Sequence, residues 1–120
     1  MQAAEQPAAD AQLISTVSRF DKTVCITFAG PLDLVAEDEL TGVVNEAAST
    51  PDVTALHFDL TRVTFIDSSG LRGLIQSSQT ALDNGLTFTI DTEEDGPVAR
   101  LLDLTNLRGH FTHAKSSVPS

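Results

Sequence analysis

Residues 59–75 read DLTRVTFIDSSGLRGLI, and this stretch decides the fold because it joins two different periodic patterns. Its first part ends a strand-like run, its centre is the polar segment Asp67-Ser68-Ser69-Gly70, and its last part opens a helical pattern. Apolar and small residues then fall on one helical face, at Leu71, Leu74, Ile75, Ser78 and Leu82. The sequence therefore predicts a helix that starts at Ser68 and stops at Asn84-Gly85.

The polar segment falls at a helix N-terminus, which leaves backbone N–H groups without partners and carries a partial positive charge. Asp and Ser side chains accept hydrogen bonds there, and the same geometry favours a phosphate. From spacing alone, the simpler interpretation is that Asp67, Ser68 and Ser69 cap the helix. A phosphate on Ser68 would instead add a charge of about −1.5 to −2, which would repel a docked partner and leave the helix standing.

Upstream of this stretch, alternating residues predict strands over 13–19 and 23–29, joined by a turn at Asp21-Lys22. Cys25 faces away from the apolar side of the second strand, and we interpret it as a buried or half-buried inert thiol. An amphipathic helix is predicted over 34–48.

A strand over 53–60 follows, and then a loop that contains Val63 and Phe65. Beyond the central stretch, a strand is predicted over 86–91, and Asp95-Gly96-Pro97 starts a further helix. Phe111 is assigned to a last short strand. This order predicts an α/β fold with a mixed sheet of about four to five strands, three or more helices packed on it, and a functional surface at the carboxyl ends of strands.

Length and composition predict a single domain over 11–114, with flexible tails at 1–10 and 115–120. Seventeen acidic residues against seven basic ones give a net charge of −10, which disfavours direct binding of nucleic acid or an anionic membrane. One cysteine cannot form an internal disulfide, and neither a signal peptide nor a membrane-spanning run is evident. We therefore expect a cytoplasmic protein.

Catalytic and cofactor signatures are absent from the sequence. His57, His110 and His113 lack metal-site or relay spacing, and neither a Gly-x-Ser-x-Gly elbow nor a Walker sequence is present. The sequence predicts no metal, no cofactor and no enzymatic activity. An acyl-transfer or phosphate-handling enzyme that uses Asp67 and Ser68 is the alternative, and it lacks an evident base.

The run DLTRVTFIDSSGLRGLI resembles the signature of the STAS family (sulphate transporter and anti-sigma factor antagonist), in which a strand leads into an Asp-Ser-Ser/Thr-Gly-Leu-Gly loop that opens a helix. FAGPLD at 28–33 is similar to the Gly-x-Leu/Ile-Asp turn of that family, and PVARLLDLTNL at 97–107 is similar to its last helix. The resemblance covers residues 13–113 and implies a single STAS domain.

In bacterial members that act as anti-sigma factor antagonists, the serine directly after the aspartate is phosphorylated by an anti-sigma factor that is also a serine kinase. The resemblance assigns that role to Ser68. It implies that the unphosphorylated protein binds the anti-sigma factor and releases a sigma factor, and that phosphorylation ends this binding. A phosphatase that resets Ser68 is a further candidate partner.

The resemblance also implies a partner-binding surface around Ser68, made of Asp33, Asp67, Ser69, Gly70, Leu71 and Arg72. Structural roles compete with this assignment, since Asp33 could cap the first helix, Ser69 could be an ordinary helix residue and Gly70 could be a packing glycine. Arg72 departs from the family pattern, which has a small residue there. We interpret it as a solvated helix charge, and an ion pair with Asp67 or phosphoserine is the alternative.

A second role within the family is kept as an alternative function. STAS domains also serve as accessory subunits of lipid-transport systems and as cytoplasmic modules of anion transporters. The Ser-Ser pair and the acidic chain favour the anti-sigma factor antagonist, and identification of the binding partner would separate the two roles.

Overall fold

The fold begins with an antiparallel hairpin, in which β1 (Ile14–Phe20) pairs with β2 (Thr23–Leu32). The computed structural model describes residues 12–34 and 36–115, so the predicted tails lie outside the described residues except for Lys115. Asp21 has a φ of +56° in the two-residue turn, a left-handed conformation that Asp tolerates better than most residues. The predicted hairpin is confirmed.

The described residues form a five-stranded mixed sheet in the order β1-β2-β3-β4-β5. β3 (Ala55–Ile66), β4 (Thr87–Asp91) and β5 (Thr112–His113) each run parallel to the preceding strand, whereas β1 and β2 are antiparallel. β1 is one edge strand and the short β5 is the other. This arrangement confirms the predicted α/β class and mixed sheet.

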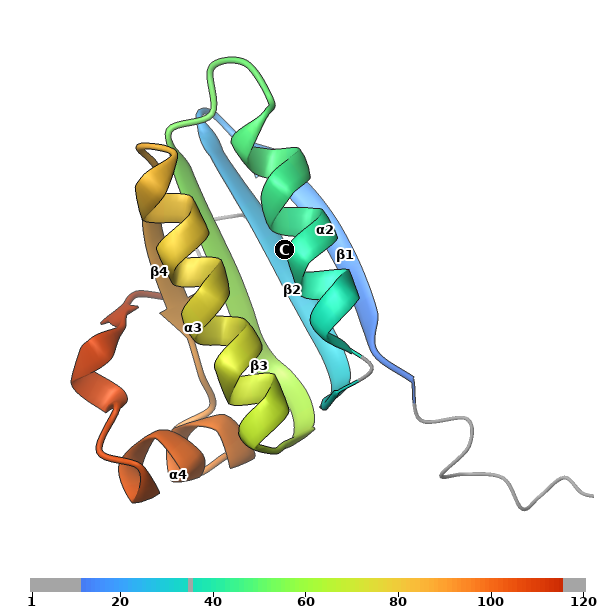
Figure 1. The fold of residues 1–120 in the computed structure, drawn as a ribbon, viewed down its shortest axis with the longest axis vertical. Coiled ribbons are helices and arrows are strands. Elements are labelled where there is room, and N and C mark those ends of the chain that lie inside the picture. Colours follow the sequence, from blue (N-terminus) through green and yellow to red (C-terminus); the bar gives the residue numbers. More distant parts are fainter. Residues whose placement is uncertain (1–11, 35, 116–120) are drawn as a thin grey trace, which may run out of the picture.

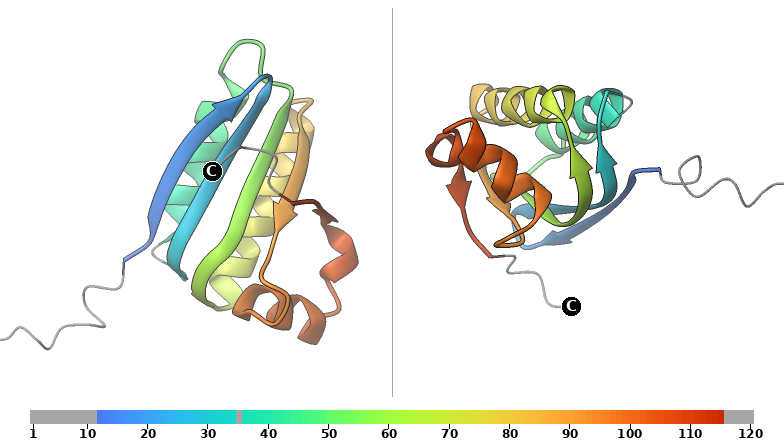
Figure 2. Two further views of the ribbon diagram at one scale, coloured as in Figure 1. Left: turned by 180° about the vertical axis from the view of Figure 1, so that it is seen from behind. Right: turned by 90° about the horizontal axis from the view of Figure 1, so that it is seen from below.

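Two helices, α2 (Ala36–Ala48) and α3 (Ser68–Asp83), lie side by side on one face of the sheet (Figure 1). Each helix connects two parallel strands, and such crossovers place the helix on the sheet. The shorter α4 (Pro97–Leu104) packs against β3 and is followed by the 3₁₀ turn η1 (Arg108–His110). Seen from behind, the strands lie in front of α2 and α3 (Figure 2), so these two helices leave the opposite face of the sheet uncovered.

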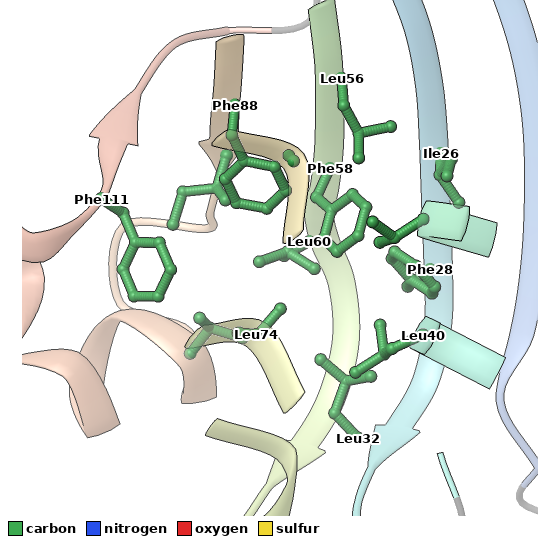
Figure 3. Close-up of a cluster of buried hydrophobic side chains, with 14 of the residues drawn as sticks. Ile26, Phe28, Leu32, Leu40, Leu56, Phe58, Leu60, Leu74, Phe88 and Phe111 are labelled. Carbon is green, nitrogen blue, oxygen red and sulfur yellow. The ribbon is translucent and has the colours of Figure 1, made fainter. Parts of the chain in front are cut away.

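The core fills the space between the sheet and the two long helices (Figure 3). Phe28, Phe58 and Phe88 stand on neighbouring strands, with edge-to-face ring pairs 4.8 and 4.9 Å apart between centroids. Leu40 from α2 and Leu74 from α3 are buried against this row. The packing fixes the two helices relative to the carboxyl ends of β2 and β3.

β3 is longer than the sequence indicated. The prediction placed Val63 and Phe65 in a loop, but β3 continues to Ile66 and pairs with the last part of β2. The pairing includes two register shifts, and irregularities of this kind bend paired strands. Because the partner strand lies much earlier in the chain, the local pattern could not reveal the extension.

Two residue placements also need correction. Leu82 is exposed, and Ala81 takes its predicted place on the buried face of α3. Successive helical residues are rotated by about 100° around the helix axis. Ala81 therefore lies on the same buried face as Leu74, whereas Leu82 is rotated away from that face. Phe111 is buried but precedes β5, which starts at Thr112.

Candidate functional site

The two strand ends that carry the predicted site lie side by side. Leu32 pairs in register with Ile66, and the backbone N–H of Asp67 donates to the Leu32 carbonyl at 3.3 Å. Asp33 and Asp67 therefore leave neighbouring parallel strands at the same end of the sheet, at the foot of Figure 1. Strand-to-helix loops gather at this end, which is where sequence reasoning placed the functional surface.

Asp67 is the N-cap of α3. Its backbone is extended, with φ −119° and ψ −171°, and its side-chain Oδ1 accepts a hydrogen bond from the Gly70 N–H at 3.0 Å. The Leu71 N–H donates to the Asp67 carbonyl at 2.9 Å and closes the first turn. The capping interpretation is therefore confirmed for Asp67, and the helix starts at Ser68 as predicted.

Gly70 allows the first turn of α3 to contact the end of β2 directly. A Cβ built on Gly70 would overlap the Leu32 carbonyl oxygen and lie 2.8 Å from the Leu32 carbonyl carbon. These atoms belong to backbone that the sheet holds in place, so no side-chain rotation could relieve the overlap. Gly70 is thus a packing glycine, and the close approach holds Ser68 next to the end of β2.

Ser68 is exposed at the first residue of α3, and Ser69 is half-buried beside it. Residues 12–34 and 36–115 provide no hydrogen-bond partner for the Ser68 hydroxyl. The backbone N–H groups of the first helical turn surround this position, and their partial charges favour an anion there. Ser68 is therefore open to solvent at the start of α3.

Arg72 pairs with α2, and neither Asp67 nor Ser68 is its partner. Its Nε lies 3.1 Å from Oε2 of Glu37, and the two side chains are partly exposed. The α2–α3 contact beside this pair is close, because a Cβ on Gly73 would lie 2.7 Å from Cδ1 of Leu40. Arg72 is therefore a largely exposed helix charge, in agreement with its interpretation as a solvated one, and its ion-pair partner is Glu37 of the neighbouring helix rather than Asp67.

The remaining predicted contact residues differ in accessibility. Asp33 is half-buried, and its carbonyl accepts from the Ala36 N–H at 3.0 Å where α2 begins. Leu71 is buried in the core like Gly70, so both lie beneath the surface around Ser68. Contact between any of the predicted residues and a partner stays a prediction.

Two exposed apolar residues near Ser68 were missed by sequence reasoning. Leu34 follows β2 directly and is 62% exposed, and Phe65 near the end of β3 is 51% exposed. Phe65 pairs in register with Pro31 of β2, which places it at the same end of the sheet as the carboxyl ends of β2 and β3. The available signal was that Leu34 directly follows Asp33 and that Phe65 lies two residues before Asp67. Because Phe65 was predicted to lie in a loop, its place at the end of a strand was not recognised.

The histidines that form hydrogen bonds in the described residues lie away from Ser68. His57 Nδ1 lies 2.6 Å from Thr89 Oγ1, and His113 Nε2 is 2.9 Å from the Arg108 carbonyl, so neither ring is bonded to Ser68. No group of three or more His, Cys, Asp or Glu in residues 12–34 and 36–115 could hold a metal ion. Of the helices that the structure describes, none has the length and apolar character needed to cross a bilayer.

The comparisons with known proteins agree on the fold. A crystal structure of an anti-sigma factor antagonist from Mycobacterium paratuberculosis is similar, with 24% identity, a TM-score of 0.71 and 90% of each chain covered. The Bacillus cell fate determinant SpoIIAA in its phosphorylated form is 19% identical, with a TM-score of 0.63 over 86% of this chain and 93% of that chain. No curated protein gave a significant match.

A murine solute carrier 26 anion transporter contains a similar unit, with 20% identity and a TM-score of 0.54 over 69% of this chain and 16% of that chain. The family model of the STAS domain matches residues 15–119. This match covers both strand ends, the helices α2, α3 and α4 and the Asp67–Ser68 segment. The chain therefore belongs to the STAS domain family.

Proposed function

We propose that this STAS domain is an anti-sigma factor antagonist whose binding to an anti-sigma factor is ended by phosphorylation of Ser68. The observation that carries the proposal is an exposed serine at the first position of α3, directly after the N-cap Asp67. Similar folds include SpoIIAA, an anti-sigma factor antagonist whose structure is known in unphosphorylated and phosphorylated forms. The partner is a serine kinase, and the domain is its substrate and binding partner, not a catalyst.

The phosphoryl transfer needs little from the domain itself. Ser68 Oγ attacks the γ-phosphorus of ATP held by the kinase, the bond from that phosphorus to the bridging oxygen breaks, and ADP leaves. The hydroxyl proton passes to a base of the kinase. The domain contributes a serine held in one place, because the Asp67 cap and the Gly70 contact with Leu32 fix the start of α3.

Phosphorylation would change the surface more than the fold. The phosphate adds a charge of about −1.5 to −2 at the N-terminus of α3, where helix N–H groups offset part of it. An unmodified partner surface would cover Ser68 together with Leu34 and Phe65, whose exposed side chains offer apolar contact area. Covering an unpaired dianion costs several kcal/mol, so the contact is lost.

Charge around the site favours a basic partner surface. The first turn of α2 contains Glu37, Asp38 and Glu39, and the strand ends add Asp33 and Asp67. Arg72 beside them is engaged by Glu37. An acidic edge of this kind attracts a basic surface and speeds its association.

The phosphorylation test uses the purified domain, ATP and candidate histidine-kinase-like anti-sigma factors from the same genome. Mass spectrometry of the digested product should locate one phosphate on Ser68. Ser68→Ala should take up none, and Ser69→Ala, the matched change of the half-buried neighbour, should still be modified. Phosphate on Ser69 alone, or none with any kinase that binds the domain, would contradict the proposal.

A role as a module of a transport system is the second candidate function. The similar unit in the murine anion transporter favours it, although this chain spans only 16% of that protein. Affinity purification separates the two roles. Recovery of an ATPase subunit or a membrane transporter would support the transport role, and recovery of a serine kinase would support the antagonist.

A further inference from the structure

β1 is an edge strand that the described residues leave unpaired on one side. It lies at the end of the sheet order, beside β2 only. Edge strands usually carry charges, prolines or bulges that prevent further pairing, but β1 is seven residues long, pairs with β2 without register shifts and has Arg19 as its one charge. Three of its side chains are large, apolar and exposed, namely Ile14 (64%), Val17 (58%) and Phe20 (48%).

The hairpin turn sets which backbone groups of β1 face the free edge. Phe20 and Thr23 flank a two-residue turn, so they exchange backbone hydrogen bonds, and bonded pairs then alternate along the strand. The even-numbered residues of β1 therefore bond to β2. Ser15, Val17 and Arg19 direct their N–H and C=O groups away from β2, toward the free edge.

The large apolar residues of β1 are evenly spaced about Val17, with Ile14 three residues before it and Phe20 three residues after it. In an antiparallel pair of two β1 strands centred on this residue, Val17 lies opposite Val17 of the second copy, in a bonded pair that uses the free N–H and C=O groups. Ile14 then lies opposite Phe20 of the second copy, on the face away from the helices. β-Branched and aromatic cross-strand pairs of this kind stabilise sheets.

A charge pair supports the same register. Ser15, Val17 and Arg19 share the helix side of β1, and the Ser15 hydroxyl donates to the Glu39 carboxylate of α2. In the symmetric pair, Ser15 lies opposite Arg19 of the second copy. The guanidinium of Arg19 from the second copy would then lie next to the Glu39 carboxylate. Two-fold symmetry gives two such Arg19–Glu39 ion pairs per dimer. Within residues 12–34 and 36–115, Arg19 Nε donates to the carbonyl of Asp21.

We propose that two copies of this chain associate through their β1 edges, in antiparallel register about Val17, to form one continuous sheet with Arg19–Glu39 ion pairs across the seam. A second copy fits this edge because the apolar spacing, the direction of the free hydrogen-bonding groups and the charge pair all share one two-fold axis. The proposal does not depend on the anti-sigma factor role.

Amide hydrogen exchange measured by NMR over a concentration series tests the register directly. The N–H groups of Ser15, Val17 and Arg19 should exchange about tenfold more slowly once nine chains in ten are dimeric, because they become bonded across the seam. Thr16 and Ser18, which bond to β2, should change far less. Sedimentation equilibrium on the same samples should show a mass that rises from one chain to two.

Substitutions then test the side chains. Val17→Lys places two ammonium groups opposite each other and should abolish the dimer, whereas Leu82→Lys, the matched change at an exposed leucine of α3, should leave it intact. Arg19→Glu or Glu39→Arg alone should weaken the dimer at least tenfold. The double variant Arg19→Glu/Glu39→Arg should restore most of the affinity.

Either of two results would overturn the proposal. One is a wild-type protein that stays monomeric up to its solubility limit. The other is a dimer that does not use this register. Such a dimer would survive Val17→Lys and both single charge reversals, or would protect amides other than those of Ser15, Val17 and Arg19. Should Val17→Lys fail to fold, as judged by circular dichroism, the charge-reversal set still decides between these outcomes.

Discussion

A side chain at residue 70 would need space that the Leu32 carbonyl already occupies. This one contact links the start of α3 to the end of β2, and with it the positions of Ser68 and Asp33. The Asp67 cap acts on the same turn, since its carboxylate accepts from the Gly70 N–H. Asp67 and Gly70 thus both fix the position of Ser68, and substitution of each residue separates their effects.

Gly70→Ala should lower the free energy of unfolding by about 1–3 kcal/mol, because the methyl group must push helix and strand apart. Gly42→Ala is the matched control, since a Cβ there meets nothing within 4 Å and the residue lies inside α2. The control should raise stability by about 0.5–1 kcal/mol. Urea denaturation measures both, and equal effects of the two changes would contradict this account of Gly70.

At the residue scale, local patterns predicted the site only in part. The positions of Asp67 and Ser68 followed from helix-start chemistry, which depends on neighbours within one turn. The partner of Arg72 did not, because Glu37 lies on another helix. Accessibility of Phe65 depended on the pairing of β3 with β2, which no local pattern contains.

Among the elements, β3 connects the core to the site. Its first half carries the buried Leu56, Phe58 and Leu60, and its second half pairs with the last part of β2 up to Ile66, two residues before Ser68. The periodicity of the sequence predicted the first half correctly, together with the hairpin, α2 and α3. It missed the second half, because those residues are held as a strand by a distant pairing partner.

His57 on β3 gives this element a measurable dependence on pH. Burial lowers the pKa of His57 below its usual 6.5, against the opposing charges of Asp91 and Asp59. Its Nδ1 is bonded to Thr89, and its Nε2 is buried with no hydrogen-bond partner in the described part of the chain. Protonation therefore favours the unfolded state, where the ring takes up a proton first as the pH falls.

The contribution of His57 to stability should be complete above pH 6.5 and should decline as the pH falls below it, by at most about 1.4 kcal/mol per pH unit. His57→Asn keeps a polar group near Thr89 and should remove this slope. His110→Gln, a change at an exposed histidine, controls for loss of a ring. Denaturant midpoints between pH 7.5 and 5 give the slope, and an unchanged slope in His57→Asn would contradict the assignment.

For the whole molecule, the sheet and helices form a rigid support with two separate surfaces. One is the carboxyl end of β2 and β3, where Ser68, Leu34 and Phe65 are exposed. The other is the β1 edge, at the end of the strand order. Because Asp67 and Gly70 tie α3 to β2 by backbone and cap contacts, a phosphate on Ser68 should alter the first surface without unfolding the support.

The central claim is tested most directly by titrating the cognate anti-sigma factor with the domain before and after stoichiometric phosphorylation of Ser68, using calorimetry. The phosphorylated domain should keep its circular dichroism spectrum and bind at least about a hundredfold more weakly, the ratio that corresponds to a loss of about 2.7 kcal/mol. Equal affinities of the two forms, with phosphate verified on Ser68, would contradict the account.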